Sequence, residues 1–395
     1  MAQLRLRLQT VTPMFMAGAN PRGEPELRPP AFRGALRYWL RAALGGVIGD
    51  QNTQRLYELE SEVFGSAADK AGSASAVNVR LAWENTPKPL KFEKQPPQSV
   101  TRNGKPMKQP TGRDYLYWSM SESRKGANDW KQFFPPESKF NLILGTRRAG
   151  FERPFNSAIV SLWLLTHLGG VGSRSRRTAG SLSVVDSSES NGLQFAMQAN
   201  TISEATNFLS ASLKQARIAM RNVISDSPAL AAPSAFDVLH PQTCQVWVLG
   251  IWPTSDAAVT AIGKQMRDFR SCKEPDHKDV AKWLNGSSIA TVERSVFGLP
   301  LPFRYSDGGP QGVVQGHLTP KPALERRASP LWLKVTKTTS GKFVGIATLF
   351  GSEFLPRGEK LNVKAGAPPI PPPKDYQIIL DWVASWGNAQ KVSYV

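Results

Sequence analysis

The segment Leu168-Gly-Gly-Val-Gly-Ser-Arg-Ser-Arg-Arg177 most constrains the fold, because it carries three glycines and three arginines between an apolar helical stretch and a strand-like one. Glycine permits positive φ and lets other groups approach the backbone closely. A P-loop has the opposite order, strand before helix, and ends in Gly-Lys-Ser/Thr, so that interpretation is rejected. A helix C-cap beside a dipole-stabilised cation explains one glycine and one arginine, but not three of each. Because arginine binds phosphate in a bidentate way, the segment indicates a polyanionic ligand.

The overall charge agrees with that indication. The chain has 49 Lys and Arg against 31 Asp and Glu, giving a net charge of +18 and a pI near 10.0. Such an excess is typical of proteins that bind nucleic acid or anionic membranes, although a basic surface without such a partner has the same composition. With 395 residues and 41% hydrophobic residues, the chain is expected to form two packed domains.

The cysteines and the first residues limit the other classes. Cys244 and Cys272, with four histidines scattered elsewhere, form neither a disulfide framework nor a zinc pattern, so no metal or cofactor is expected. The first eight residues alternate apolar and polar and contain no signal-peptide core, and no apolar run reaches the length of a membrane span. We expect a soluble cytoplasmic protein without a membrane partner.

The first half of the chain alternates strand and helix signals. Period-two alternation and apolar runs predict strands at 4–8, 77–83, 140–145 and 182–185. Helices are predicted from Pro29-Pro30 to Gly45-Gly46 and from about 154 to 168. The order strand, helix, strand, strand, helix, strand is that of a ferredoxin-like domain. We therefore predict an α+β fold with such a domain at 1–190.

The rest of the chain repeats this pattern more weakly. Residues 191–240 contain a linker and an amphipathic helix at about 202–223. A second ferredoxin-like domain is predicted at 241–395, from strands at 243–249, 331–335 and 342–349 and helices near 257–269 and 375–386. Glu62-Val-Phe-Gly65 echoes Ser295-Val-Phe-Gly298, which suggests a duplication. Residues 84–138 read as an insertion with a small hairpin outside the core. Its aromatic residues either stack on bases or form a small local core: Tyr115, Tyr117, Trp118, Trp130, Phe133 and Phe134.

The first predicted helix carries a second arginine pattern. Arg33, Arg37 and Arg41 recur every four residues and so form one stripe beside an apolar face. A solvated polar face is the usual fate of such a stripe. No Asp or Glu lies between Glu26 and Asp50 to pair with it at helical spacing, and we therefore expect the stripe to bind phosphates.

These motifs together resemble a known family. His167–Leu182 is similar to the glycine-rich loop of RAMPs (repeat-associated mysterious proteins), the RNA-binding subunits of CRISPR effector complexes. Within that family, Thr12–Phe15 and Glu26–Ala42 resemble the first subunit of the Cmr-type (type III-B) complex, as do Val296–Pro300 and Arg326–Val335. The second half lacks the family's arginine-rich glycine loop, and only Phe350–Arg357 stands in its place.

The resemblance implies two tandem ferredoxin-like (RAMP, or RRM-like) domains with insertions. It also implies a non-catalytic subunit near the 3′ end of the guide RNA (crRNA), with crRNA, target RNA and the backbone and capping RAMP subunits as partners in antiviral defence. The expected RNA-binding residues are Arg28, Arg33, Arg37, Arg41, Arg147, Arg148, Gly169, Gly170, Gly172, Arg174, Arg176 and Arg177.

Two other functions stay open. Some RAMP relatives cut RNA, and Glu24 and Glu26 in the loop after the first strand could hold Mg²⁺ in a metal-dependent endoribonuclease acting on target RNA. His167 is expected to be a helix cap or a core residue, since it ends an apolar helix. A third possibility is an assembly protein that makes no direct contact with RNA.

Overall fold

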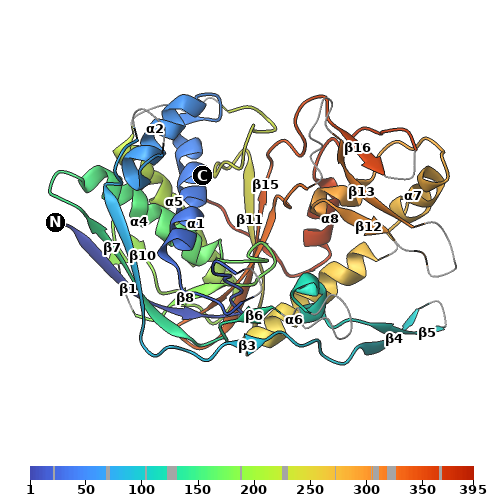
Figure 1. Ribbon diagram of the computed structural model, residues 1–395, viewed down its shortest axis with the longest axis horizontal. Coiled ribbons are helices and arrows are strands. Elements are labelled where there is room, and N and C mark those ends of the chain that lie inside the picture. Colours follow the sequence, from blue (N-terminus) through green and yellow to red (C-terminus); the bar gives the residue numbers. More distant parts are fainter. Residues whose placement is uncertain are drawn as a thin grey trace.

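The first half of the chain folds around one antiparallel sheet. Its four strands lie in the order β2-β7-β1-β8, and helices α1 and α4 pack together beside it. The elements are β1 (Gln3–Thr10), α1 (Pro29–Ile48), α2 (Thr53–Phe64), β2 (Val77–Trp83), β7 (Lys139–Thr146), α4 (Glu152–His167) and β8 (Leu182–Val184). The computed structural model (Figure 1) describes residues 1–20, 23–67, 72–102, 105–121, 131–186, 189–224, 230–271, 273–303, 305, 311–317, 326–363 and 367–395.

The second half contains a sheet with the same order. Its strands lie in the order β14-β15-β11-β17 and all three pairings are antiparallel. In both halves the first strand is flanked by the third and fourth, and the second lies at the edge. The elements are β11 (Cys244–Trp252), α6 (Ser255–Arg270), α7 (Asp276–Leu284), η2 (Glu293–Phe297), β14 (Leu331–Lys337), β15 (Phe343–Phe350), α8 (Gln377–Ala384) and β17 (Gln390–Lys391).

The predicted α+β class with antiparallel sheets is confirmed. Helix α5 (Ile202–Val223) also lies where the sequence places it, between the two halves of the chain. Smaller sheets complete the fold: β9 (Glu189–Ser190) with β10 (Leu193–Gln194), and β12 (Leu301–Phe303) with β13 (Gly312–His317) and β16 (Lys360–Val363). No helix among the described residues is long and apolar enough to cross a membrane.

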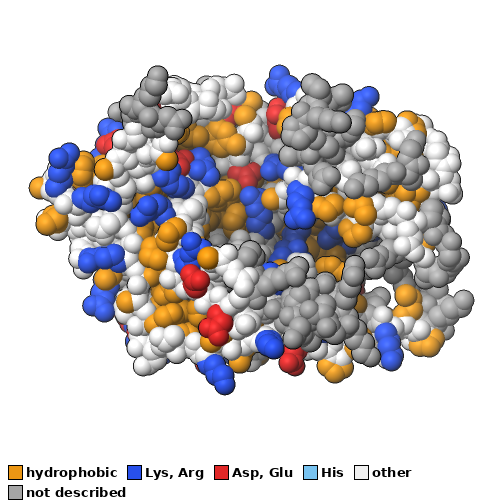
Figure 2. All heavy atoms as spheres, viewed as in Figure 1, with side chains coloured by type: hydrophobic (Ala, Val, Ile, Leu, Met, Phe, Trp, Pro, Cys, Tyr) orange, Lys and Arg blue, Asp and Glu red, His pale blue; other side chains and the backbone are white. Residues whose placement is uncertain are grey.

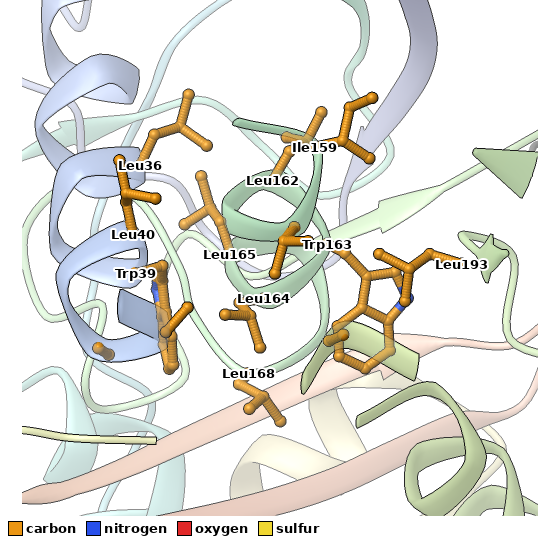
Figure 3. Close-up of a cluster of buried hydrophobic side chains, with 14 of the residues drawn as sticks. Leu36, Trp39, Leu40, Ile159, Leu162, Trp163, Leu164, Leu165, Leu168 and Leu193 are labelled. Atoms are coloured by element: carbon orange, nitrogen blue, oxygen red, sulfur yellow. The ribbon is translucent and has the colours of Figure 1, made fainter. Parts of the chain in front are cut away.

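The core of the first half lies between α1 and α4. Figure 3 shows Leu36 and Leu40 of α1 facing Leu162 and Leu165 of α4, and all four side chains are fully buried. The apolar positions of α1 recur at helical spacing, so that one face meets α4 and the arginines lie along the side next to that face. This packing fixes where the stripe points.

Helix α1 is longer than the sequence predicts. It continues through Gly45-Gly46 and ends at Ile48, with Gly49 at φ +84°. A Cβ atom on Gly46 would lie 2.4 Å from the carbonyl oxygen of Leu239, and one on Gly45 would lie 3.0 Å from Phe236. The two glycines therefore let the segment before β11 cross the helix closely, and they do not end it.

The insertion forms the predicted hairpin, but it is not outside the core. It contains β3 (Leu90–Lys91), β4 (Gln98–Arg102), β5 (Lys105–Gln109), α3 (Gly112–Leu116), the 3₁₀ turn η1 (Trp118–Met120) and β6 (Gln132–Phe133). Phe92, Tyr117 and Phe133 are buried around Phe15, with ring centroids 5.3–5.8 Å from it. The expectation of a loop outside the core is thus wrong for these rings, and the alternative of a local aromatic core holds for Tyr117 and Phe133. Trp118 is 58% exposed, and Trp130 lies outside the described residues.

The insertion also joins the two halves. Figure 1 shows it running along the lower side of the molecule from β3 past α6 to the β4–β5 hairpin. Helix α3 packs on α6, where a Cβ atom on Gly112 would lie 1.9 Å from Thr260 O and one on Gly263 would lie 1.9 Å from Gly112 O. Two glycines at the crossing allow this close approach of one backbone to the other.

The suggested internal repeat has a common structural role. Phe64 ends α2 and Phe297 ends η2, and the following Gly65 and Gly298 have φ of +79° and +119°. Both glycines terminate a helical segment in a conformation that other residues rarely adopt.

Candidate nucleic-acid interface

The glycine loop is held tightly by the protein itself. Gly172 has φ +81°, and a Cβ atom there would lie 2.3 Å from the carbonyl oxygen of Phe15. A Cβ atom on Gly169 would lie 2.2 Å from Trp39 Nε1, and one on Gly170 would lie 2.9 Å from Ala179 O. Of the three predicted glycines, one has a positive φ. At all three positions, the atoms that approach the backbone closely belong to the protein itself.

Several amide groups of the loop are already bonded within the chain. The N–H of Val171 donates to Gly180 O at 3.0 Å, Ser173 to Phe15 O at 2.8 Å and Thr178 to Leu333 O at 3.0 Å. Arg174 has φ +62°, an uncommon value for a residue other than glycine, and its carbonyl accepts from Arg177 N at 2.7 Å. The loop is therefore a rigid turn that aims its side chains.

The loop arginines meet carbonyl oxygens and rings, with one long carboxylate contact. Arg174 Nε donates to Leu116 O at 2.9 Å, and Arg177 Nη2 donates to Phe297 O at 2.5 Å. The Arg176 guanidinium carbon lies 4.6 Å from the Trp332 ring centroid and 5.3 Å from that of Tyr38, and its Nη1 donates to Ser329 O. Its Nη2 is 3.5 Å from Asp237 Oδ2. The carbonyl and ring contacts leave the cationic charge uncompensated, whereas Asp237 offsets part of the charge of Arg176.

The arginine stripe has the acidic partner that we did not expect. Arg37 Nη1 lies 2.6 Å from Glu60 Oε1 and Arg41 Nη1 lies 2.9 Å from Glu60 Oε2. Arg37 also donates to the carbonyl oxygens of Phe64 and Gly65. Glu60 is on α2, so the absence of acids at helical spacing within α1 did not reveal it. Arg33 is half-buried, and its Nε has no hydrogen-bond partner among the described residues.

The remaining predicted residues lie apart from the loop. Arg28 precedes α1 and its Nε is 3.8 Å from Glu26 Oε2. Arg147 and Arg148 are exposed and follow β7, whose last residues pair with the start of β1. The glycine loop leads instead to β8, which pairs with the end of β1. The fold thus places Arg147 and Arg148 at the opposite end of the sheet from the loop.

A cavity of about 700 Å³ lies between the two halves. Its walls come from α1, α2, the glycine loop, the segment before β11, the segment before β14 and the segment after β15. The lining residues are Tyr38, Arg41, Leu56, Arg176, Ala235, Phe236, Asp237, Arg326, Arg327, Ala328, Glu353, Phe354 and Pro356. Figure 2 shows a hollow near the middle of the face, with Lys and Arg side chains gathered in it.

The charges in this cavity are unequal. Four arginines face two carboxylates, Asp237 and Glu353. Asp237 is nearly buried and accepts hydrogen bonds from Tyr38 Oη and Ser352 Oγ, both at 2.6 Å. Burial, and then the Asp237 charge, raise the pKa of Tyr38 well above its usual value, so Tyr38 stays a neutral donor. Arg327 donates to the carbonyl oxygens of Phe354 and Glu353, and Arg326 is exposed and makes no ion pair among the described residues.

Arg326 and Arg327, which line the cavity, were not among the residues predicted from the sequence. Both lie in the Arg326–Val335 motif that carries the resemblance, and an Arg-Arg pair before a strand was the available signal. Asp237 offered no such signal, because a single aspartate before Val238 looks like an ordinary loop residue. Of the predicted residues, the structure brings Arg41 and Arg176 into the cavity.

The groups considered for catalysis lie elsewhere. His167 is buried and stacked on Trp163 at 4.2 Å, and burial lowers its pKa to about 3, which confirms a core residue. Glu24 and Glu26 are exposed. Among the described residues, no three His, Cys, Asp or Glu side chains are grouped as a metal site. The endoribonuclease hypothesis therefore gains no residue from the structure.

Comparison with known proteins supports the predicted family. The RAMP superfamily model matches residues 7–183. The chain is 34% identical over 190 residues to CRISPR system Cmr subunit Cmr1-2 of Pyrococcus furiosus, covering 45% of this chain and 92% of that protein. It is 27% identical over 353 residues to Cmr1-1 of the same organism, covering 88% of each chain. The chain belongs to the RAMP superfamily.

Within that superfamily it belongs with the Cmr1 subunits of type III-B CRISPR complexes. The crystal structure of Cmr1 from P. furiosus has a TM-score of 0.62 at 23% identity and covers 100% of this chain and 99% of its own. A chain from a cryo-EM structure of the type III-B Cmr-beta complex bound to cognate target RNA has a TM-score of 0.53 at 14% identity, covering 97% of this chain and 98% of its own. These two structures share its fold.

Proposed function

We propose that this chain is the RNA-binding subunit of a type III-B ribonucleoprotein effector complex, and that it holds guide RNA, target RNA or both near the 3′ end of the guide in antiviral defence. The cavity between the two halves carries this proposal, because its lining contains four arginines from three separate segments and only two carboxylates. The related Cmr-beta complex is described as bound to cognate target RNA. No catalytic role is proposed for the chain.

The proposal includes the domain organisation. We interpret the two sheets of identical strand order as tandem ferredoxin-like domains at 1–190 and 241–395, joined through 191–240 and bridged by the insertion at 84–138. Guide RNA and target RNA would lie across their junction. Other RAMP backbone and capping subunits would pack on the same chain.

The affinity for RNA should depend strongly on salt and little on sequence, because arginines that face phosphates release counterions on binding. The test is the binding of a fluorescent single-stranded oligouridine to the full chain across a salt series. We expect Arg326→Gln with Arg327→Gln to lower the salt slope by about one to two units, since both residues line the cavity and neither forms an ion pair among the described residues. Lys278→Gln with Lys282→Gln is the charge-matched control, because both lysines are exposed on α7.

An unchanged slope in the double variant would show that the cavity does not face RNA. Absence of salt-dependent binding by the wild-type chain would instead favour an assembly role without RNA contact. The two outcomes are distinct, since the first concerns the cavity and the second the whole protein.

A further inference from the structure

The two four-stranded sheets meet along one edge of each, and their outer edges differ in length. Strand β14 lies beside β8, and Leu333 on β14 donates to Arg176 O and accepts from Thr178 N. Of the outer strands, β17 has two residues and β2 has seven. Folded proteins commonly protect a sheet edge with a short strand, a bulge or a proline. Strand β2 has none of these, because it pairs with β7 in continuous register and contains no proline.

The outer side of β2 presents backbone groups to its surroundings. At the two ends of the pairing, Arg147 N donates to Ala76 O and Glu84 N donates to Lys139 O, both at 3.1 Å. Because alternate residues bond across an antiparallel pair, the even-numbered residues of β2 face β7 and the odd-numbered ones face away. Three outward-facing residues make no backbone hydrogen bond to any other described part of the chain, and we call them the open edge: Val79, Leu81 and Trp83.

The face of the sheet beside this edge is basic. The apolar side chains of β1 and β7 point into the core with α1 and α4, so the residues between them face the opposite way. On that face, Arg80 of β2 and Arg5 of β1 flank Ile143 of β7 in one row. Both arginines are exposed, and Arg5 Nε donates to Asn141 Oδ1 at 3.1 Å. Neither arginine forms an ion pair among the described residues, so the row lacks a negative partner.

The surroundings of the open edge favour a protein over RNA. Tyr38 and Arg41 of α1 line the cavity proposed for RNA, and α1 packs on the face of the sheet opposite to Arg80. Figure 1 shows β1 and β7 towards the left end of the molecule, with α1 between them and the second half. In addition, the alternating N–H and C=O groups of a strand edge match another polypeptide backbone, and RNA has no such alternation.

We propose that the open edge adds a strand from a neighbouring protein subunit, and that this strand alternates acidic and apolar side chains. The added backbone would bond the outward-facing N–H and C=O groups of β2. Its acidic side chains would lie beside Arg80, and its apolar ones beside the half-buried Leu81 and Trp83.

A second copy of this chain is the wrong partner for the open edge. Strand β2 is centred on Arg80, so two copies paired antiparallel in full register would set Arg80 against Arg80. Like charges directly opposite each other in a sheet are destabilising. The inference rests on the proposed place of this chain in a multi-subunit complex, and it does not depend on RNA binding by the cavity.

Residue-resolved hydrogen exchange tests the added strand, in the effector complex purified from its host and in the isolated full chain. In the isolated chain, the amides of the open edge should exchange faster than those of Asn78, Arg80 and Ala82, which face β7. In the complex, we expect the open-edge amides to slow about tenfold or more. Unchanged exchange in the complex would overturn the proposal. If oligouridine alone slows these amides in the isolated chain, nucleic acid covers the edge and the assignment to a protein is overturned.

Charge reversal tests the acidic character of the partner. We expect Arg80→Glu to lower incorporation into the complex about tenfold in competition with tagged wild-type chain, and Arg80→Lys to stay within about twofold of the wild type. Arg221→Glu is the matched control, because Arg221 is exposed on α5 and forms no ion pair within the described part of the chain. Equal incorporation of Arg80→Glu and Arg221→Glu would overturn the acidic partner.

Oligouridine binding separates this proposal from the proposed function. Arg80→Glu and Arg221→Glu should bind oligouridine equally, since both change the net charge by the same amount and neither residue lines the cavity. A larger loss for Arg80→Glu would place RNA on the open sheet face and overturn the assignment to a protein. Absence of oligouridine binding by the wild type would overturn the RNA-binding function and leave the open-edge proposal standing.

Discussion

The arginine stripe of α1 and two arginines of the glycine loop, Arg174 and Arg177, have different electrostatic surroundings. Arg37 and Arg41 share the carboxylate of Glu60 at 2.6 and 2.9 Å. Arg174 and Arg177 meet the carbonyl oxygens of Leu116 and Phe297. A carboxylate cancels the charge of a cation, whereas a carbonyl oxygen only orients it. Arg174 and Arg177 therefore have no carboxylate partner among the described residues, whereas Arg37 and Arg41 are held by one that they share.

The largest expected effect concerns the rigidity of the loop. Gly172→Ala would place a Cβ atom 2.3 Å from Phe15 O at φ +81°, and we expect it to lower the free energy of unfolding by about 3 kcal/mol or more. Gly150→Ala is the control, because Gly150 has φ +84° with open space around it and should cost only about 1 kcal/mol. Chemical denaturation measures both. Equal losses would mean that the loop yields easily and does not aim its arginines.

The next effect concerns the stripe. Glu60→Gln removes the one carboxylate that two arginines share, and we expect it to lower the free energy of unfolding by about 2 kcal/mol. It should also strengthen oligouridine binding, since Arg37 and Arg41 lose their counter-ion. Glu62→Gln breaks a more exposed pair with Arg153 and should cost about 0.5 kcal/mol or less. Weaker RNA binding by Glu60→Gln would contradict the contrast between stripe and loop.

A smaller effect is expected for the pH dependence of stability, which involves His167 at the start of the loop. Because burial holds the pKa of His167 at about 3, the folded chain keeps it neutral while the unfolded chain protonates it below about 6.5. Stability from this residue is present above about pH 6.5 and falls as the pH drops towards 3. Relative to His167→Gln, the wild type should lose about 1 kcal/mol between pH 7 and 5.5. Parallel pH profiles for the two proteins would show that His167 is solvated and that the loop is not anchored on a dry core.

The smallest effect is expected for RNA binding by the stripe itself. Arg37→Gln should leave the salt slope of oligouridine binding nearly unchanged, because Glu60 and the carbonyl oxygens of Phe64 and Gly65 already occupy the donors of Arg37. Arg326→Gln should lower the slope by about one unit, since Arg326 is exposed and unpaired among the described residues. A drop of one unit for Arg37→Gln would restore the sequence-based expectation that the whole stripe faces RNA.

Secondary structure was predictable because its signals are local. Periodicity placed β2, β7 and α5 within a residue or two of their observed ends, and proline at the helix start placed α1. The end of α1 was missed because Gly45 and Gly46 serve a contact with 236–239, a segment nearly two hundred residues away. A helix-ending glycine and a close-packing glycine look the same in one sequence.

The candidate site was predictable only in part, for a similar reason. Arg176 could be identified from its motif, but the carbonyls, rings and carboxylates around it come from Ser329, Trp332 and Asp237. Arg147 and Arg148 were grouped with the loop by charge alone, and the sheet places them at its opposite end.

The sequence by itself determined the family, the α+β class, the order of the elements and the excess of positive charge. The family follows from the resemblance of the motifs, and the other properties follow from local periodicity, turn chemistry and composition, none of which needs knowledge of distant contacts. Only the tertiary structure decided which arginines have a carboxylate partner. Glu60 reaches the stripe from α2, whereas no carboxylate pairs with Arg174, Arg177 or Arg270 among the described residues. The burial of the insertion's rings and the packing of α3 on α6 are also seen only in the tertiary structure. Contacts between surfaces far apart in the chain depend on their shapes and not on any local pattern.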